Sequence, residues 1–196
     1  MQTLEQKGLL PAQMLEQLPT FMAKIELLAS EIGLSLENHQ ADHIALRVND
    51  WETAEQLHQA WLSYGEEWSN NEINGRPIIV IGFHTPITVK NWTIEALELP
   101  YPGDKAYPQE GWEHVEFVVS AKAASTDALK VVLDETFPDL KASWNTLDDK
   151  GIKVKASCPS GEHERLANPT YAFKKGGVCI KLHPCSLKAV IESEQA

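Results

Sequence analysis

Residues 42–48, DHIALRV, and residues 113–119, EHVEFVV, carry the pattern that decides the fold. In both stretches every second residue is apolar, and the alternating residues are Ile44, Leu46, Val48, Val115, Phe117 and Val119. This alternation is typical of a β-strand with one face buried. Each stretch also places a histidine, His43 or His114, directly after an acidic residue. The same motif at two places indicates an internal duplication.

Similar elements follow both strands. Apolar residues at helical spacing predict helices over 51–64 and 121–136. The strands predicted after these helices cover 66–72, 76–83 and 92–99 in the first half and 140–147, 152–157 and 177–183 in the second. Asn74-Gly75 marks a hairpin turn, and a long polar loop is expected over 158–176. Both halves therefore have the order βαβββ.

The first 40 residues show a helical pattern instead. Pro19 suits the first turn of a helix, and Gly33 suits its end. We therefore expect a single compact domain with four segments. They are a helical extension over 1–40, a first βαβββ module over 41–103, a second over 104–187 and a tail over 188–196.

Composition narrows the class of protein. With 28 acidic and 17 basic residues in 196, the net charge of −11 argues against nonspecific binding to nucleic acid or to an anionic membrane. No segment has the ~20 apolar residues of a membrane span, and no secretory signal is visible. The three cysteines, Cys158, Cys179 and Cys185, predict free thiols in a reducing cytoplasm. We expect a cytoplasmic protein, monomeric or homodimeric, that acts on a small molecule.

Three residues point to a metal site. His43 and His114 face away from the apolar rows of their strands, and Glu98 leans to the same side in the strand over 92–99. Two imidazoles and one carboxylate predict a three-ligand divalent-metal site with open coordination positions. A buried carboxylate needs a cation, so a salt bridge from Glu98 to Arg47 or Lys181 is the alternative.

Neighbouring residues suggest further roles. Glu116 is a candidate general base, or a partner that orients His114, but it is equally consistent with a solvent-facing strand residue. Arg47 is a candidate for binding a substrate carboxylate. His183 is a reserve metal ligand. The loop over 158–176 could close as a lid or simply be mobile.

Taken together, these features resemble the vicinal oxygen chelate superfamily, which includes glyoxalase I, the extradiol dioxygenases and the bleomycin resistance proteins. Over its full length the chain is similar to the YecM family of small proteins, to which metal binding is attributed. The resemblance implies an α+β fold, with two βαβββ modules forming a half-open barrel of mixed β-sheet after an N-terminal helical extension. It also implies ligands at His43, Glu98, His114 and Lys181. Lys181 departs from the pattern, because a protonated lysine is not a normal metal ligand, and we expect it to bind substrate.

The resemblance leaves the function open between three classes. The first is a metal-dependent isomerase, lyase or dioxygenase that uses Zn, Ni, Mn or Fe on a substrate with two adjacent oxygens. The second is a non-catalytic protein that binds or sequesters a small ligand, as the bleomycin resistance proteins do. The third is an interaction module whose helical extension packs on a partner. Fold alone does not choose among them.

Overall fold

The computed structural model describes residues 2–73, 75–158 and 166–195. The chain forms two compact units. The first contains the chain up to Met22 and then His43–His114, and the second contains Ala23–Asp42 and the chain from Val115 onward.

Two helices precede the first strand: α1 (Leu4–Lys7) and α2 (Pro11–Ile32). Pro19 lies inside α2, so the prediction that it occupies the first turn was wrong. Pro11 takes that position and is itself buried, and the buried stripe continues at Met14. The prediction that the helix ends at Gly33 is confirmed, since this glycine has a φ of 89°.

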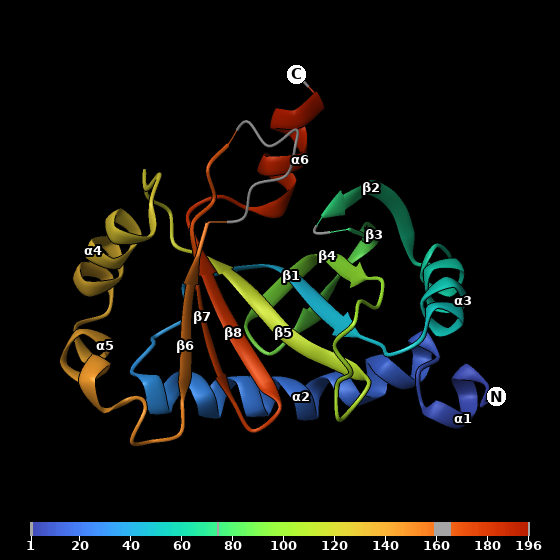
Figure 1. The fold of residues 1–196 in the computed structure, drawn as a ribbon, viewed down its shortest axis with the longest axis horizontal. Coiled ribbons are helices and arrows are strands. Elements are labelled where there is room, and N and C mark those ends of the chain that lie inside the picture. Colours follow the sequence, from blue (N-terminus) through green and yellow to red (C-terminus); the bar gives the residue numbers. More distant parts are fainter. Residues whose placement is uncertain (1, 74, 159–165, 196) are drawn as a thin grey trace. The chain divides into compact units, whose positions relative to one another are not determined.

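The first module has the predicted order of elements (Figure 1). They are β1 (Gln40–Arg47), α3 (Trp51–Trp61), β2 (Gly65–Ile73), β3 (Arg76–Val89) and β4 (Trp92–Pro100). The strand order is β2-β3-β4-β1, with β1 parallel to β4 and the other two pairs antiparallel. The sheet of this unit is therefore mixed. Asn74, in the predicted hairpin turn, lies outside the described residues.

The core of the first unit follows from the alternation seen in the sequence. Ile44 on β1 lies beside Leu97 on β4, and both are fully buried. Helix α3 packs on β4 and buries Leu57 and Trp61. The faces of β1 and β4 that carry His43 and Glu98 therefore point away from this apolar layer.

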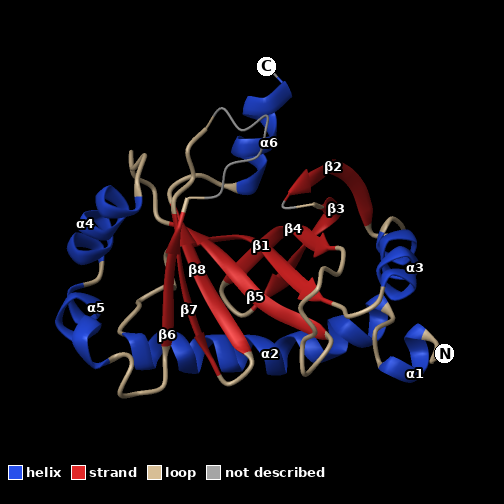
Figure 2. Cartoon of the chain, viewed as in Figure 1, coloured by secondary structure: helices blue, strands red, loops and turns tan. Residues whose placement is uncertain are grey.

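The second module has the elements β5 (Gly111–Val118), α4 (Thr126–Thr136), α5 (Pro138–Ser143), a 3₁₀ turn (Trp144–Thr146), β6 (Lys153–Ser157), β7 (Thr170–Lys175), β8 (Val178–His183) and α6 (Leu187–Gln195). Strands β6, β7 and β8 run antiparallel side by side (Figure 2), in the order β5-β8-β7-β6. The mixed α+β class, with N-terminal helices and a repeated βαβββ order, is confirmed.

Two local predictions in this unit were wrong. Residues 140–147 form α5 and the 3₁₀ turn rather than a strand, because Pro138 starts a helix that buries Leu140. Strand β7 occupies the C-terminal part of the predicted loop over 158–176. Residues 159–165 of the proposed lid lie outside the described residues. Within the described part of the chain, no helix is both long and apolar enough to span a membrane.

Candidate metal centre

Parallel pairing of β1 with β4 sets the first two predicted ligands next to each other. His43 lies beside Ala96, and Ala45 lies beside Glu98, so His43 and Glu98 point from the same face of adjacent strands. The Nε2 atom of His43 is 3.7 Å from the Oε2 atom of Glu98. The His43 side chain is 2% exposed and that of Glu98 is 14% exposed, so both lie in a setting that largely excludes water.

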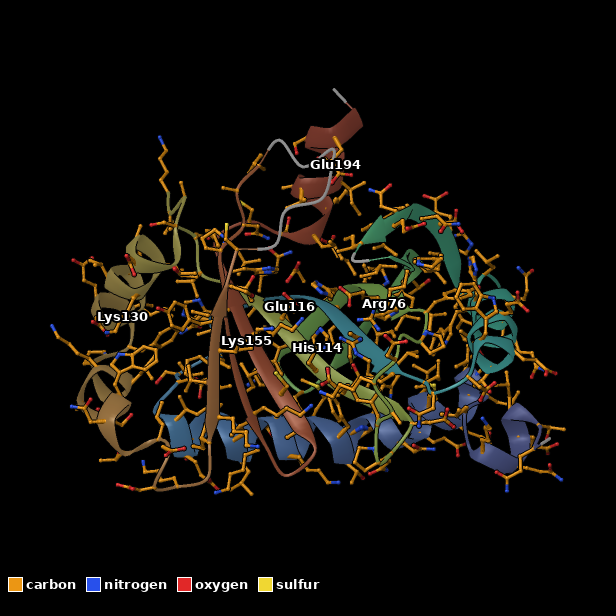
Figure 3. The ribbon with its side chains drawn as sticks, in the orientation of Figure 1. Arg76, His114, Glu116, Lys130, Lys155 and Glu194 are labelled. Atoms are coloured by element: carbon orange, nitrogen blue, oxygen red, sulfur yellow. The ribbon has the colours of Figure 1, made fainter. Side chains whose placement is uncertain are left out.

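The third predicted ligand, His114, is fully buried on β5 (Figure 3). One ligand atom from each of His43, Glu98 and His114 lies within 4.8 Å of the others. The two imidazole rings meet edge to face, with centroids 6.3 Å apart. A divalent metal of the zinc, nickel, manganese or iron type accepts this donor set, so the residues present fit such an ion. All three belong to the first unit.

Glu113 supports His114 from the neighbouring position and was not predicted. Its Oε2 atom is hydrogen-bonded to Nδ1 of His114. A carboxylate on Nδ1 fixes the ring and leaves Nε2 as the nitrogen that can take a metal, the arrangement usual behind metal-binding histidines. Adjacent residues of a strand point to opposite faces, so alternation alone could not identify Glu113 as a partner.

Arg47 is the cation of this group. Its guanidinium is 3.7 Å from carboxylate oxygens of both Glu98 and Glu113, and its Nη1 donates a 2.9 Å hydrogen bond to the carbonyl of Leu46. Burial alone would lower the pKa of Arg47, but the charges of Glu98 and Glu113 outweigh it and raise the pKa. The predicted alternative, a salt bridge between Glu98 and Arg47, is therefore present. With neutral imidazoles, two carboxylates and one guanidinium leave a net charge of −1, which suits a cation.

The other predicted residues, Glu116 and Lys181, form an ion pair in the second unit, with 2.7 Å between Oε1 and Nζ. Glu116 is buried, so the alternative of a solvent-facing strand residue is wrong. Its second oxygen is 3.2 Å from Nδ1 of His183, the reserve ligand.

Asp42 completes this second network and was also not predicted. Its Oδ1 atom is 2.9 Å from Nε2 of His183, and its Oδ2 accepts a 2.7 Å hydrogen bond from the backbone of Leu187 at the start of α6. Asp42, His183 and Glu116 are all at least 94% buried. Asp42 precedes His43 in the opening motif, and this repeated acidic residue was the available signal for its role. Its position in the strand did not identify a partner.

Comparison with known proteins gives one consistent result. The family model described as "YecM protein" matches residues 11–194. The chain is 41% identical over 179 residues to "Protein YecM" from Escherichia coli (strain K12), covering 91% of each chain. It is 35% identical over 176 residues to an uncharacterized protein from Haemophilus influenzae, covering 87% of this chain and 88% of that one. A solved structure described as "Structural Genomics, Protein EC4020" matches with a TM-score of 0.78 and 37% identity, over 96% of this chain and 93% of the other.

Proposed function

Since the chain belongs to the YecM family, whose relatives' names specify no activity, we propose a function from the site itself: the protein binds one divalent metal ion through His43, Glu98 and His114. The observation that carries this proposal is the buried group of two imidazoles and one carboxylate, with ligand atoms within 4.8 Å of one another. Glu113 adds support, because it holds the ring of His114 in a ligating orientation.

We further propose that the protein is an enzyme of the isomerase, lyase or dioxygenase type. Three protein ligands leave coordination positions for a substrate that offers two adjacent oxygens. The bound ion would supply Lewis-acid chemistry. Arg47, buried beside the ligands, is suited to hold a carboxylate of that substrate. In the second unit, the buried carboxylate of Glu116 is the proposed general base, and Lys181 is the proposed substrate-binding cation.

The alternative is a non-catalytic protein that binds or sequesters a small ligand. One observation favours it: Arg47 already lies 3.7 Å from Glu98, so this carboxylate has a counter-charge without a metal. In both versions the partner is a small molecule, since the net charge of −11 opposes binding to nucleic acid. A cytoplasmic monomer or homodimer is proposed for both.

Metal analysis tests the site. Protein purified without chelator and supplemented with Zn, Ni, Mn or Fe should retain about one equivalent after gel filtration, and His43→Ala and His114→Ala should each lose it. His58→Ala is the matched control, because His58 is a buried histidine of the same unit that pairs with Glu67. Absence of retained metal in the wild type, or retention in both site variants, would contradict the proposal.

A further inference from the structure

The guanidinium of Arg47 is hydrogen-bonded to the side chain of Tyr107 and to the carbonyl of Leu46, and one further donor, Nε–H, is unused. Arg47 is 8% exposed, and its Nε–H is buried with no hydrogen-bond partner among the described residues. The two carboxylates near its terminal nitrogens lie at 3.7 Å, beyond ordinary hydrogen-bond distance. A buried donor without an acceptor is costly, so an anion that reaches this guanidinium would gain a strong, charge-assisted hydrogen bond.

The connection between β4 and β5, residues 101–110, brings two more groups to Arg47. The ring of Tyr107 lies 5.9 Å from the guanidinium carbon of Arg47, and the Nζ atom of Lys105 lies 5.1 Å from the centre of the same ring. Lys105 is exposed, and it forms no ion pair among the described residues. Two cations therefore flank one phenol ring, and within the described part of the chain Lys105 has no counter-charge.

Hydrogen bonds to Asn49 hold this connection near Arg47. Asn49, two residues after Arg47, accepts a 2.6 Å hydrogen bond from the backbone of Tyr107 and donates a 2.8 Å hydrogen bond to its carbonyl. The backbone of Asn49 also donates a 2.8 Å hydrogen bond to the side chain of Glu110. These three bonds hold the backbone of Tyr107 and the side chain of Glu110 against Asn49, two residues after the buried arginine.

We propose that Arg47, Tyr107 and Lys105 form a binding site for a small organic dianion with two carboxylates. The inner carboxylate accepts a hydrogen bond from the Nε–H of Arg47, and the outer carboxylate pairs with Lys105. The phenol ring of Tyr107 forms the wall between them.

This inference deepens the proposed function, because it names the substrate class for the metal site and rests on that site only for what happens after binding. Recognition of the anion uses Arg47, Tyr107 and Lys105 and needs no metal, although the charges of Glu98 and Glu113 beside Arg47 weaken it. A binding experiment on metal-free protein therefore tests this proposal even if His43 and His114 bind no ion.

Isothermal titration calorimetry on the full chain in EDTA provides the test, with malonate, acetate and inorganic phosphate as probes. Malonate should bind about 10-fold or more tightly than acetate, because a second charged pair forms only with the dianion. Equal affinities for malonate and acetate would overturn the proposal. Phosphate that binds 10-fold more tightly than malonate would overturn the dicarboxylate class.

Variants separate the two ends of the site. Lys105→Gln should weaken malonate binding about 3- to 10-fold and leave acetate binding unchanged, whereas Lys122→Gln, an exposed lysine of the second unit, should change neither. Arg47→Lys keeps the charge but loses the planar fork, and should weaken both probes about 10-fold or more. Malonate affinity that is unchanged in both Lys105→Gln and Arg47→Lys would overturn the proposal.

Discussion

Glu113 lies outside the proposed ligand set but contacts one of its members. Its contact with Nδ1 of His114 fixes the ring and increases the electron density that the other nitrogen offers to a metal. Glu113→Gln should therefore reduce metal affinity about 10- to 100-fold with little change in fold. Competition with a fluorescent chelator measures the affinity. Glu52→Gln, an exposed glutamate on α3, is the control, and equal affinities for both variants would argue against the role of Glu113.

Asp50 predicts a pH dependence of stability. Burial alone would raise its pKa, but hydrogen bonds from Lys7 and Thr53 lower it to about 2. Because the folded pKa lies below the unfolded value of about 3.9, the stabilisation is complete above that value and is lost as pH falls toward 2. Asp50 also caps the N-terminus of α3.

Two variants separate the cap from the charge. Asp50→Ala should lower the free energy of unfolding by about 1–2 kcal/mol at pH 7, and Asp50→Asn, which keeps a capping side chain, should lower it by less. The difference between wild type and Asp50→Asn should shrink between pH 5 and pH 3 in urea titrations. A difference that grows as pH falls would contradict the lowered pKa.

The site could be predicted in part because strand alternation fixes the direction of each side chain. His43, Glu98 and Arg47 were placed correctly on one face, since each lies opposite a buried apolar neighbour. Glu113 and Asp42 were missed, because their roles depend on contacts that a one-strand pattern does not contain. Alternation reports on the face of a strand, whereas a partner on another element depends on tertiary packing.

At the level of elements, long regular patterns predicted well and short ones did not. The openings DHIALRV and EHVEFVV form β1 and β5, and the two main helical stripes form α3 and α4. Residues 140–147 are short and apolar, a pattern that fits a strand or a buried helical turn equally well. Pro138 was the deciding signal, because proline favours the first turn of a helix.

The β2–β3 hairpin contains a tight packing arrangement that a mutation can test. A Cβ atom on Gly82 would lie 1.8 Å from the indole ring of Trp68. Gly82→Ala should therefore lower the free energy of unfolding by about 1–3 kcal/mol, because Trp68 must move. Adding Trp68→Ala should remove most of this penalty. Denaturant unfolding of the two single variants and the double variant measures the coupling.

Gly65 offers a contrasting case on the partner strand. A Cβ atom there would lie 2.2 Å from the carbonyl oxygen of Gly82, which is backbone and cannot rotate away. Gly65→Ala should therefore be at least as destabilising as Gly82→Ala, and Trp68→Ala should not rescue it. Rescue of both glycine variants by Trp68→Ala would show that the hairpin as a whole is adaptable.

At the scale of the whole molecule, the strongest consequence of the proposed site is a link between metal binding and stability. All three ligands belong to the first unit, so the ion should stabilise that unit against unfolding. Metal at 100 times its dissociation constant adds about 2.7 kcal/mol, which corresponds to a rise in Tm of about 5–10 °C for a chain of this size.

Tryptophan fluorescence is the appropriate signal for this experiment, because five of the six tryptophans lie in the first unit and Trp144 alone lies in the second. The metal-dependent rise in Tm should survive Trp144→Phe, which leaves only reporters from the first unit. It should disappear in a His43→Ala/His114→Ala double variant and persist in His58→Ala. A rise of equal size in the double variant would place the ion outside the proposed ligands. The absence of any rise in the wild type would leave the sequestering alternative, in which Arg47 neutralises Glu98, as the better account of the buried charges.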